Sequence, residues 1–339
     1  VARLRARLNP RLHWQLVRGF PATIDAIKGV LVKQKIDLVQ INGVSNPHAA
    51  MAARQLGVPI VWQILDTFPP IWFRALMMPY VTRTAGAVMS TGRRVAGAHP
   101  GALALSDKLI YFHPPVDVER FTFSAEQRVR ARQELGLGPD DEVVGNVSNL
   151  NPQKGHRTFI RAAARLKQTR PNVKFVILGG RYETHKAYIE GLFEEARSLG
   201  FQLGSDLIVR DPKLNVAELS MAFDVFWMTP EPNSEGIPTA IEEAMSLGLP
   251  VVASDVGSIA EIVHHGVTGF VTAPRDTTAI GDFTLPLLLD ADQRRRLGAA
   301  AARFAREHFR MEVCAERHAD AYALALGRQQ NWQELSQAV

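Results

Sequence analysis

Short apolar runs alternate with amphipathic stretches along most of the chain. The candidate strands are 36–41, 58–65, 86–90 and 108–112 in the first half, and 142–147, 173–178, 206–209, 225–228, 250–253 and 269–271 in the second. These runs have strand length and are rich in β-branched residues, while the segments between them have the apolar spacing of helices. The alternation predicts an α/β fold with parallel sheets flanked by helices.

Residues that typically begin or end helices divide this pattern into elements. Asn46 suits a helix N-cap, Pro47 suits the first helical position, and Gly57 suits the stop before the next strand. Between His113 and Ser124, a His-Pro-Pro sequence and a charged stretch interrupt the pattern. Because 339 residues are long for one core, we expect two α/β domains, at 1–120 and 121–305, and closing helices at 306–339.

The first domain opens on a helix-like segment instead of the strand and glycine-rich turn that usually start a doubly wound sheet. We therefore expect this domain to be N-terminally shortened or a reduced version of the fold.

Composition is that of a folded globular protein, with 46% hydrophobic and 22% charged residues. The single cysteine, Cys314, cannot form an internal disulfide, and no Cys/His spacing indicates a zinc site. No apolar run approaches the roughly 18 residues needed to span a bilayer. These observations predict a cytoplasmic protein.

Positive charge is concentrated at the N-terminal end, although the net charge is only +5. The first 35 residues contain one acidic residue, Asp25, and eight basic residues: Arg3, Arg5, Arg7, Arg11, Arg18, Lys28, Lys33 and Lys35. The charge is consistent with a solvated helix face or with attraction to an anionic membrane surface or lipid-phosphate acceptor. Nucleic acid is disfavoured because no aromatic-and-basic recognition motif accompanies the charge.

The segment 230–250, PEPNSEGIPTAIEEAMSLGLP, carries the strongest chemical signal. It follows a predicted strand, and Pro238 suits a first helical turn, so we expect strand, loop, helix and strand in succession. The loop 234–237 would then present N–H groups at a positive helix N-terminus, a favourable place for a diphosphate. Ligands of open α/β sheets bind at these strand ends.

Two carboxylates bracket this turn, Glu235 in the loop and Glu243 in the helix. In a continuous helix they would be about 12 Å apart along the axis. A retaining glycosidase needs about 5 Å, so the pair is better suited to gripping two parts of an extended ligand through its hydroxyls. The alternative is structural: Glu235 caps the helix, and Glu242 and Glu243 are helix-surface charges.

The residues of this segment resemble the retaining GT-B glycosyltransferases of glycosyltransferase family 4. The similarity lies in Glu235-Gly-Ile-Pro, the spacing to Glu243-Ala-Met, Gly248, Pro250-Val-Val and Glu261-Ile-Val. Further pieces agree in order: Asn149-Leu-Asn-Pro-Gln-Lys-Gly155, Pro115-Val-Asp with Arg120-Phe121, and Gly266-Val-Thr-Gly269. The resemblance implies two Rossmann-like domains facing a cleft.

The resemblance also implies roles for individual residues. Lys154 would neutralise the donor diphosphate, Glu235 would contact the transferred sugar, and Glu243 would bind the ribose hydroxyls. The other donor-binding candidates share the two loops or neighbour them: Asn149, Gly155, Arg210, Gly236, Ile237, Pro238 and Thr239.

Some positions depart from the family pattern. Asn149 stands where the family often has arginine, and we expect that Arg210 replaces that cation or that nothing does. Leu65 stands where a histidine often precedes Asp66, which leaves His48 and Asp66 as acceptor-side candidates. His48 lies on a predicted helix, where it either faces the cleft or is a structural histidine. The stretch 68–80 is rich in proline, aromatics and methionine, and it fits either buried helix packing or a membrane- or acceptor-binding surface.

The predicted activity is transfer of a sugar, with retention, from a nucleotide diphosphate sugar to a hydroxyl of a glycan or lipid-linked acceptor. The resemblance implies no essential metal and no cofactor beyond the donor. Asp290-Ala-Asp292 opens a predicted helix, so we interpret it as a helix cap. The alternatives are a nucleotide-sugar epimerase of the same architecture and a degenerate binding or interaction protein.

Overall fold

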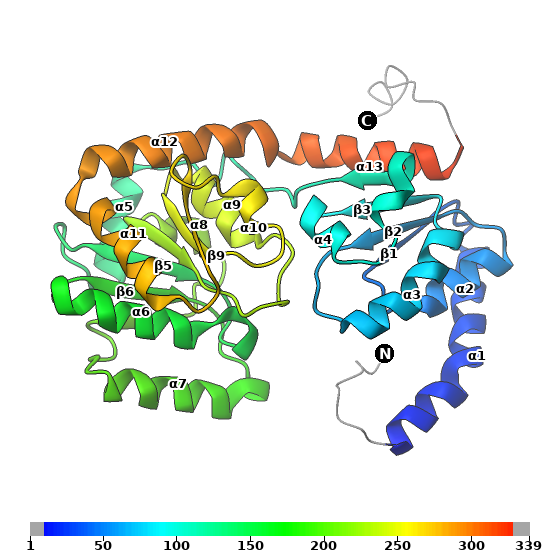
Figure 1. The fold of residues 1–339 in the computed structure, drawn as a ribbon, viewed down its shortest axis with the longest axis horizontal. Helices are drawn as coiled ribbons and strands as arrows, with labels where there is room; N and C mark the ends of the chain where they lie inside the picture. The colour runs from blue at the N-terminus through cyan, green and yellow to red at the C-terminus, as the bar shows by residue number, and fades with distance from the viewer. Residues whose placement is uncertain (1–9, 328–339) are drawn as a thin grey trace.

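The computed structural model describes residues 10–327, with side chains from residue 19 onward. The chain forms two parallel sheets, each flanked by helices and lying side by side in Figure 1. The N-terminal arginines Arg3, Arg5 and Arg7 lie outside the described residues, as do the side chains of Arg11 and Arg18.

The first sheet has four parallel strands in sequential order. They are β1 (Val39–Asn42), β2 (Ile60–Ile64), β3 (Ala87–Ser90) and β4 (Leu109–Tyr111). The helices of this half are α1 (Pro10–Lys33), α2 (Pro47–Gln55), α3 (Ile71–Thr84) and α4 (Arg93–Gly97), with a 3₁₀ turn, η1, at Leu103–Lys108.

The second sheet has six parallel strands in the order β10-β9-β8-β5-β6-β7. They are β5 (Val143–Val147), β6 (Lys174–Leu178), β7 (Leu207–Arg210), β8 (Val225–Met228), β9 (Val251–Ser254) and β10 (Gly269–Thr272). Its helices are α5 (Ala125–Glu134), α6 (His156–Thr169), α7 (Lys186–Ser198), α8 (Val216–Ser220), α9 (Thr239–Ser246), α10 (Ile259–Ile262), α11 (Thr277–Leu289) and α12 (Ala291–His308), with 3₁₀ turns η2 (Pro152–Lys154) and η3 (Glu183–His185). The strand order reverses between β5 and β8, which makes this the switch point where ligands bind in doubly wound folds.

The last described helix, α13 (Met311–Ala325), returns to the first sheet. A Cβ atom on Gly86 would lie 2.8 Å from the Cα of Ala325, so α13 packs directly against the backbone before β3. The Tyr322 hydroxyl donates to Gln40 Oε1 at 2.6 Å. The C-terminal helices therefore connect both halves, with α12 packed on α9 of the second and α13 on the first.

Burial on both faces of each sheet explains why the strands appear as apolar runs. In β8, Phe226 and Met228 belong to the core on one face, and Val225 and Trp227 belong to the core on the other. In β2, Trp62 and Val61 divide in the same way. All ten predicted strands form within three residues of their expected ends, and β8 has the predicted bounds.

Two cap predictions have different outcomes. Asp290 caps α12 as predicted, because its Oδ1 accepts from the N–H groups of Asp292 and Gln293 at 2.9 Å. Asn46 is the N-cap residue of α2 as predicted, with Pro47 at the first helical position, but its side chain accepts no capping hydrogen bond from the described residues. The Asn46 Nδ2 group instead donates to the carbonyl of Asn42 at 2.8 Å, and so holds the turn after β1.

Candidate active site

A cavity of about 330 Å³ opens at the carboxyl ends of β5, β6 and β7, beside the switch point. Its walls come from residues 147–149 after β5, 178–182 after β6 and 211–216 after β7. Asn149 lies in this wall, and its Oδ1 accepts from the N–H of Gly180 at 3.2 Å. Asn149 therefore ties two of the walls together through its amide.

The loop from β5 to α6 places Lys154 immediately before a helix N-terminus. Asn151 Oδ1 accepts from the N–H of Gln153 at 3.0 Å, which stabilises the short turn η2. Gly155 follows with φ of 64°, and a Cβ atom there would lie 1.7 Å from the carbonyl oxygen of Thr229. Only glycine fits this conformation and this close approach to the loop after β8. Gly155 thus allows the loop that carries Lys154 to lie directly against the loop after β8.

Lys154 and Glu235 form an ion pair between the two loops, with Nζ 2.6 Å from Oε1. The side chains are 26% and 11% exposed, so the pair is mostly removed from water. Burial raises the pKa of Glu235, the Lys154 ammonium opposes this rise, and the charge of Asp66 adds to it. The structure thus brings together Lys154 and Glu235, the residues predicted to neutralise the diphosphate and to contact the sugar, although they are far apart in sequence.

The loop that carries Glu235 also contacts the first domain. A Cβ atom on Gly236 would lie 1.8 Å from the carbonyl oxygen of Leu65, which follows β2. Ile237 is buried in the core below. Pro238 directly precedes α9 instead of lying in its first turn as predicted, and exposed Thr239 is the first helical residue. The helix N-terminus therefore lies at the end of the Glu235 loop.

The two glutamates of α9 have opposite surroundings. Glu243 is half-buried, and burial raises its pKa to about 7 while Arg120 opposes the rise. Glu242 has no exposed surface, and within the described part of the chain neither of its carboxyl oxygens has a hydrogen-bond partner. Burial raises the pKa of Glu242 well above its usual value, and the charge of Glu243 adds to the rise, so both favour the neutral carboxyl. The structural alternative of a surface charge is wrong for Glu242, because it lies on the helix face that meets the core.

A buried polar network lies under the Lys154 loop and was not predicted. The Ser148 hydroxyl donates to Asn146 Oδ1 at 2.6 Å, so the Ser148 oxygen is left to accept from His156 Nε2 at 3.0 Å. Burial lowers the pKa of His156 to about 4, which keeps the imidazole neutral. His156 thereby fixes the base of the loop at the start of α6. The histidine directly after Lys154-Gly155 was the signal in the sequence.

Arg210, the predicted replacement for the missing phosphate-loop cation, pairs with a carboxylate in the structure. Its guanidinium lies 2.9 Å from Glu134, and both side chains are about half exposed. Arg210 ends β7, at the edge of the sheet, beside the C-terminal end of α5, and its phosphate role stays a prediction. Lys154 is the cation that the structure places beside Glu235.

The two acceptor-side candidates, Asp66 and His48, have different surroundings in the structure. Asp66 is half-buried, its Oδ1 accepts from the N–H of Phe68 at 2.9 Å, and its charge acts on Glu235 across the domain interface. His48 packs on Phe20 of α1 with ring centroids 4.0 Å apart, and burial lowers its pKa. His48 therefore packs α2 against α1, which agrees with the structural alternative, and the acceptor-side roles of His48 and Asp66 stay predictions.

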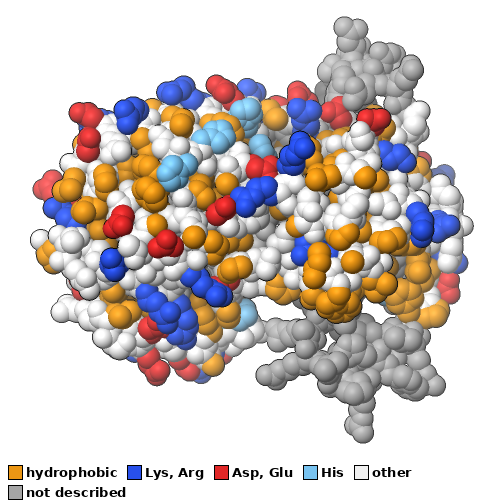
Figure 2. Space-filling model, in the orientation of Figure 1, with side chains coloured by type: hydrophobic (Ala, Val, Ile, Leu, Met, Phe, Trp, Pro, Cys, Tyr) orange, Lys and Arg blue, Asp and Glu red, His pale blue; other side chains and the backbone are white. Residues whose placement is uncertain are grey.

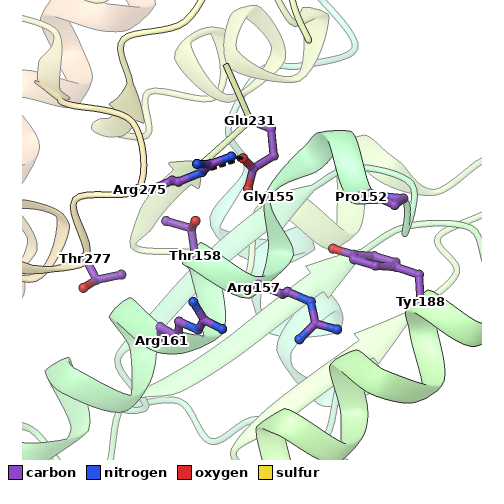
Figure 3. Close-up of a pocket in the computed structure, with 9 residues that line it drawn as sticks. All are labelled: Pro152, Gly155, Arg157, Thr158, Arg161, Tyr188, Glu231, Arg275 and Thr277. Atoms are coloured by element: carbon purple, nitrogen blue, oxygen red, sulfur yellow. Dashed lines mark hydrogen bonds and ion pairs between the residues drawn. The ribbon is translucent and has the colours of Figure 1, made fainter. Parts of the chain in front are cut away.

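A second cavity, of about 490 Å³, is lined by Gly155 and by side chains of α6, α7 and the loops after β8 and β10 (Figure 3). Its three arginines are committed to carboxylates: Arg157 and Arg161 share Glu195, and Arg275 pairs with Glu231 at 2.5 Å. The first two pairs join α6 to α7, and the third joins the loop after β10 to the loop that carries Glu235.

No group of three or more His, Cys, Asp or Glu side chains with metal-binding geometry occurs between residues 10 and 327. Over the same range, no helix is long and apolar enough to cross a membrane.

Fold and site together define a class of protein. It has two α/β domains with parallel sheets, and a lysine–glutamate pair in the second domain beside the first. A helix N-terminus and a cavity lie at the strand ends of the second domain. Residues 127–304, more than half of the chain, match the family described as glycosyl transferases group 1. The chain belongs to this family.

Named relatives and solved structures agree with this assignment. D-inositol 3-phosphate glycosyltransferase of Nocardia farcinica is 30% identical over 65% of this chain and 48% of its own length. The GDP-mannose-dependent alpha-(1-6)-phosphatidylinositol monomannoside mannosyltransferase of Mycolicibacterium smegmatis is 31% identical over 70% of this chain and 62% of its own length. The chain thus spans about half to three fifths of these curated relatives.

The structural comparisons give the fold. HepE of Anabaena, solved with UDP and glucose, has a TM-score of 0.80 at 22% identity, covering 89% of this chain and 81% of HepE. Sucrose-phosphate synthase of Thermosynechococcus elongatus has a TM-score of 0.76 at 20% identity, covering 92% and 79%. The predicted α/β fold of two facing domains, the GT-B fold, is confirmed.

Proposed function

We propose that this chain transfers a sugar from a nucleotide diphosphate sugar to an acceptor hydroxyl, with retention at the anomeric carbon as in family 4. The observation that carries the proposal is the Lys154–Glu235 pair, with Nζ 2.6 Å from Oε1, in the two loops that lead into α6 and α9. Positive charge fixed beside a helix N-terminus stabilises a departing diphosphate. UDP-glucose is the first donor to test because HepE was solved with UDP and glucose.

The residues divide the donor between them in this proposal. The cavity after β5, β6 and β7 takes the base, Glu243 accepts hydrogen bonds from the ribose hydroxyls, and Lys154 meets the diphosphate. Glu235 holds the transferred sugar, facing Asp66 on the acceptor side. The donor phosphate takes the proton of the attacking hydroxyl, and Lys154 supplies the positive charge, so the proposal includes no essential metal. Incubation with a nucleotide sugar, with and without acceptor, tests the activity: product that appears only with acceptor supports transfer, and conversion of donor alone indicates epimerisation.

Glu243 gives a pH-dependent prediction. Its raised pKa of about 7 means that the carboxyl is protonated at pH 6 and ionised at pH 8. An ionised carboxylate accepts from both ribose hydroxyls, so we expect UDP-glucose to bind more tightly at pH 8 than at pH 6, by about 5-fold if the bound pKa falls by one unit. Calorimetry with UDP-glucose is suitable because its diphosphate carries no proton in this range.

The matched variant is Glu243→Gln, which should remove this pH dependence, and Glu243→Ala should weaken binding at both pH values. Equal affinity of wild type and Glu243→Ala at pH 8 would contradict the ribose role.

We further propose that the acceptor side meets an anionic lipid surface, as expected for a lipid-linked acceptor. An exposed apolar ridge supports this: Phe68, Ile71, Trp72 and Leu76 are 59–67% exposed. The ridge begins two residues after Asp66 and continues into α3, and Figure 2 shows hydrophobic side chains gathered on this part of the first domain. An exposed patch of this kind marks an interaction surface.

The ridge has a direct test. The double variant Trp72→Ser/Leu76→Ser should reduce co-sedimentation with vesicles of mixed phosphatidylcholine and phosphatidylglycerol at least ~10-fold, because each large apolar side chain contributes about 1.5–3 kcal/mol on burial. Leu289→Ser, at a 62% exposed position in the second domain, is the control. Equal binding by all three proteins, or no binding by the wild type, would rule out the ridge as a lipid-binding surface.

A further inference from the structure

The segment that joins β9 to α10 connects the two domains next to Glu235. Glu261 of α10 reaches across to α4 of the first domain, where its Oε2 accepts from the N–H of Arg93 at 2.8 Å and its Oε1 from the N–H of Arg94 at 2.7 Å. Ser258 Oγ accepts from the N–H of Val95 at 3.2 Å. Side chains of the second domain therefore satisfy three consecutive N–H groups in the first turn of α4, which has no capping side chain of its own.

Two further features show how closely the domains meet here. Arg94 and Asp255 form an ion pair, with Nη2 3.2 Å from Oδ2. A Cβ atom on Gly92 would lie 2.2 Å from Ser258 Oγ, so the close approach of the Ser258 side chain to the start of α4 depends on this glycine. We call Glu261, Ser258 and Asp255, with the start of α4, the clasp.

The same segment also supports the Glu235 loop. The N–H of Ser258 donates to the carbonyl of Gly236 at 2.9 Å. Gly257 has φ of 60°, and a Cβ atom there would lie 2.4 Å from the carbonyl oxygens of both Glu235 and Gly236. Ser258 thus contacts the first domain through its side chain and the Glu235 loop through its backbone.

We propose that Glu261 and Ser258 are positioning residues: docking of α4 onto the clasp fixes the Glu235 loop in its transfer position as the domains close. The inference rests on the proposed function, and it adds a link between closure of the two domains and the position of the Glu235 loop. The side chains of Glu261 and Ser258 bond to α4, and their hydrogen bonds involve none of the base cavity, Lys154 or Glu243 among the described residues. The clasp is therefore expected to govern the rate of transfer and leave donor affinity unchanged, because the donor is held by the second domain alone.

The test combines kinetics with a distance measurement. Glu261→Ala should lower kcat at least ~10-fold, since two hydrogen bonds to a charged group are lost, while the affinity for UDP-glucose stays within about twofold. Ser258→Ala should lower kcat less. Glu261→Gln keeps one acceptor and should fall between Glu261→Ala and wild type. Glu126→Gln, which removes the charge of an exposed glutamate in the second domain, is the control and should match wild type.

Energy transfer between dyes on Lys33→Cys and Lys186→Cys reports the separation of the domains. Both positions are exposed, whereas Cys314 is buried. Glu261→Ala should shift the UDP-glucose-bound protein toward longer distances. Unchanged distances, or unchanged kcat in both Glu261→Ala and Ser258→Ala, would overturn the proposal. A wild type that transfers no sugar would instead refute the proposed function, and the distances would still decide whether the clasp holds the domains together.

Discussion

Lys154→Ala is expected to lower the rate of sugar transfer by about 10²–10³-fold, the usual effect of removing one preorganised group that stabilises charge in the transition state. The substitution removes the cation that lies 2.6 Å from Glu235 and directly before the N-terminus of α6. It also leaves the Glu235 carboxyl buried without its ammonium partner, which raises the Glu235 pKa further. Steady-state kinetics with UDP-glucose and an accepted acceptor measure the loss.

Two controls separate catalysis from stability. Lys186→Ala removes an exposed lysine from the start of α7 and should leave the rate and the thermal midpoint unchanged. The double variant Lys154→Ala/Glu235→Gln removes both charges, so any thermal destabilisation of the single variant should be recovered while transfer stays lost. Full activity in Lys154→Ala would mean that the diphosphate lies elsewhere.

Glu235→Gln is expected to cause a loss of similar size, about 10²–10³-fold in kcat. Glutamine keeps the shape of the side chain but removes the charge that pairs with Lys154 and faces the transferred sugar. Because the proposed contact is to the sugar, affinity for UDP should stay within about twofold of wild type, whereas turnover of UDP-glucose falls. Calorimetry with UDP and rate measurements with UDP-glucose give this split. Loss of UDP binding with normal turnover would reverse the assignment.

Local signals in the sequence predicted the strands well because burial on both sheet faces leaves a continuous apolar run. Phe226, Trp227 and Met228 alternate between two cores, yet all three are apolar. The Lys154 and Glu235 positions followed from motif resemblance, and the structure adds their contact, which joins loops after β5 and β8. These strands are neighbours only because the strand order reverses, and spacing along the chain does not encode that order.

Side-chain partners were the part that the sequence could not supply. The sequence did not show that Glu134, at the end of α5, pairs with Arg210. It also did not show that Phe20 of α1 packs against the ring of His48. Glu242 and Glu243 are adjacent and identical in type, and only the packing of α9 makes one wholly buried and the other half-buried. Each outcome depends on a residue distant in sequence.

The central claim is that the second domain binds a nucleotide diphosphate sugar and transfers its sugar. The most direct measurement is mass-spectrometric detection of glycosylated product after incubating wild type, Lys154→Ala and Glu235→Gln with a panel of nucleotide sugars and candidate acceptors, UDP-glucose and GDP-mannose included. We predict acceptor-dependent product from at least one donor with wild type, and severe loss with both variants. Equal product from all three proteins, or no donor bound or consumed by wild type, would contradict the account.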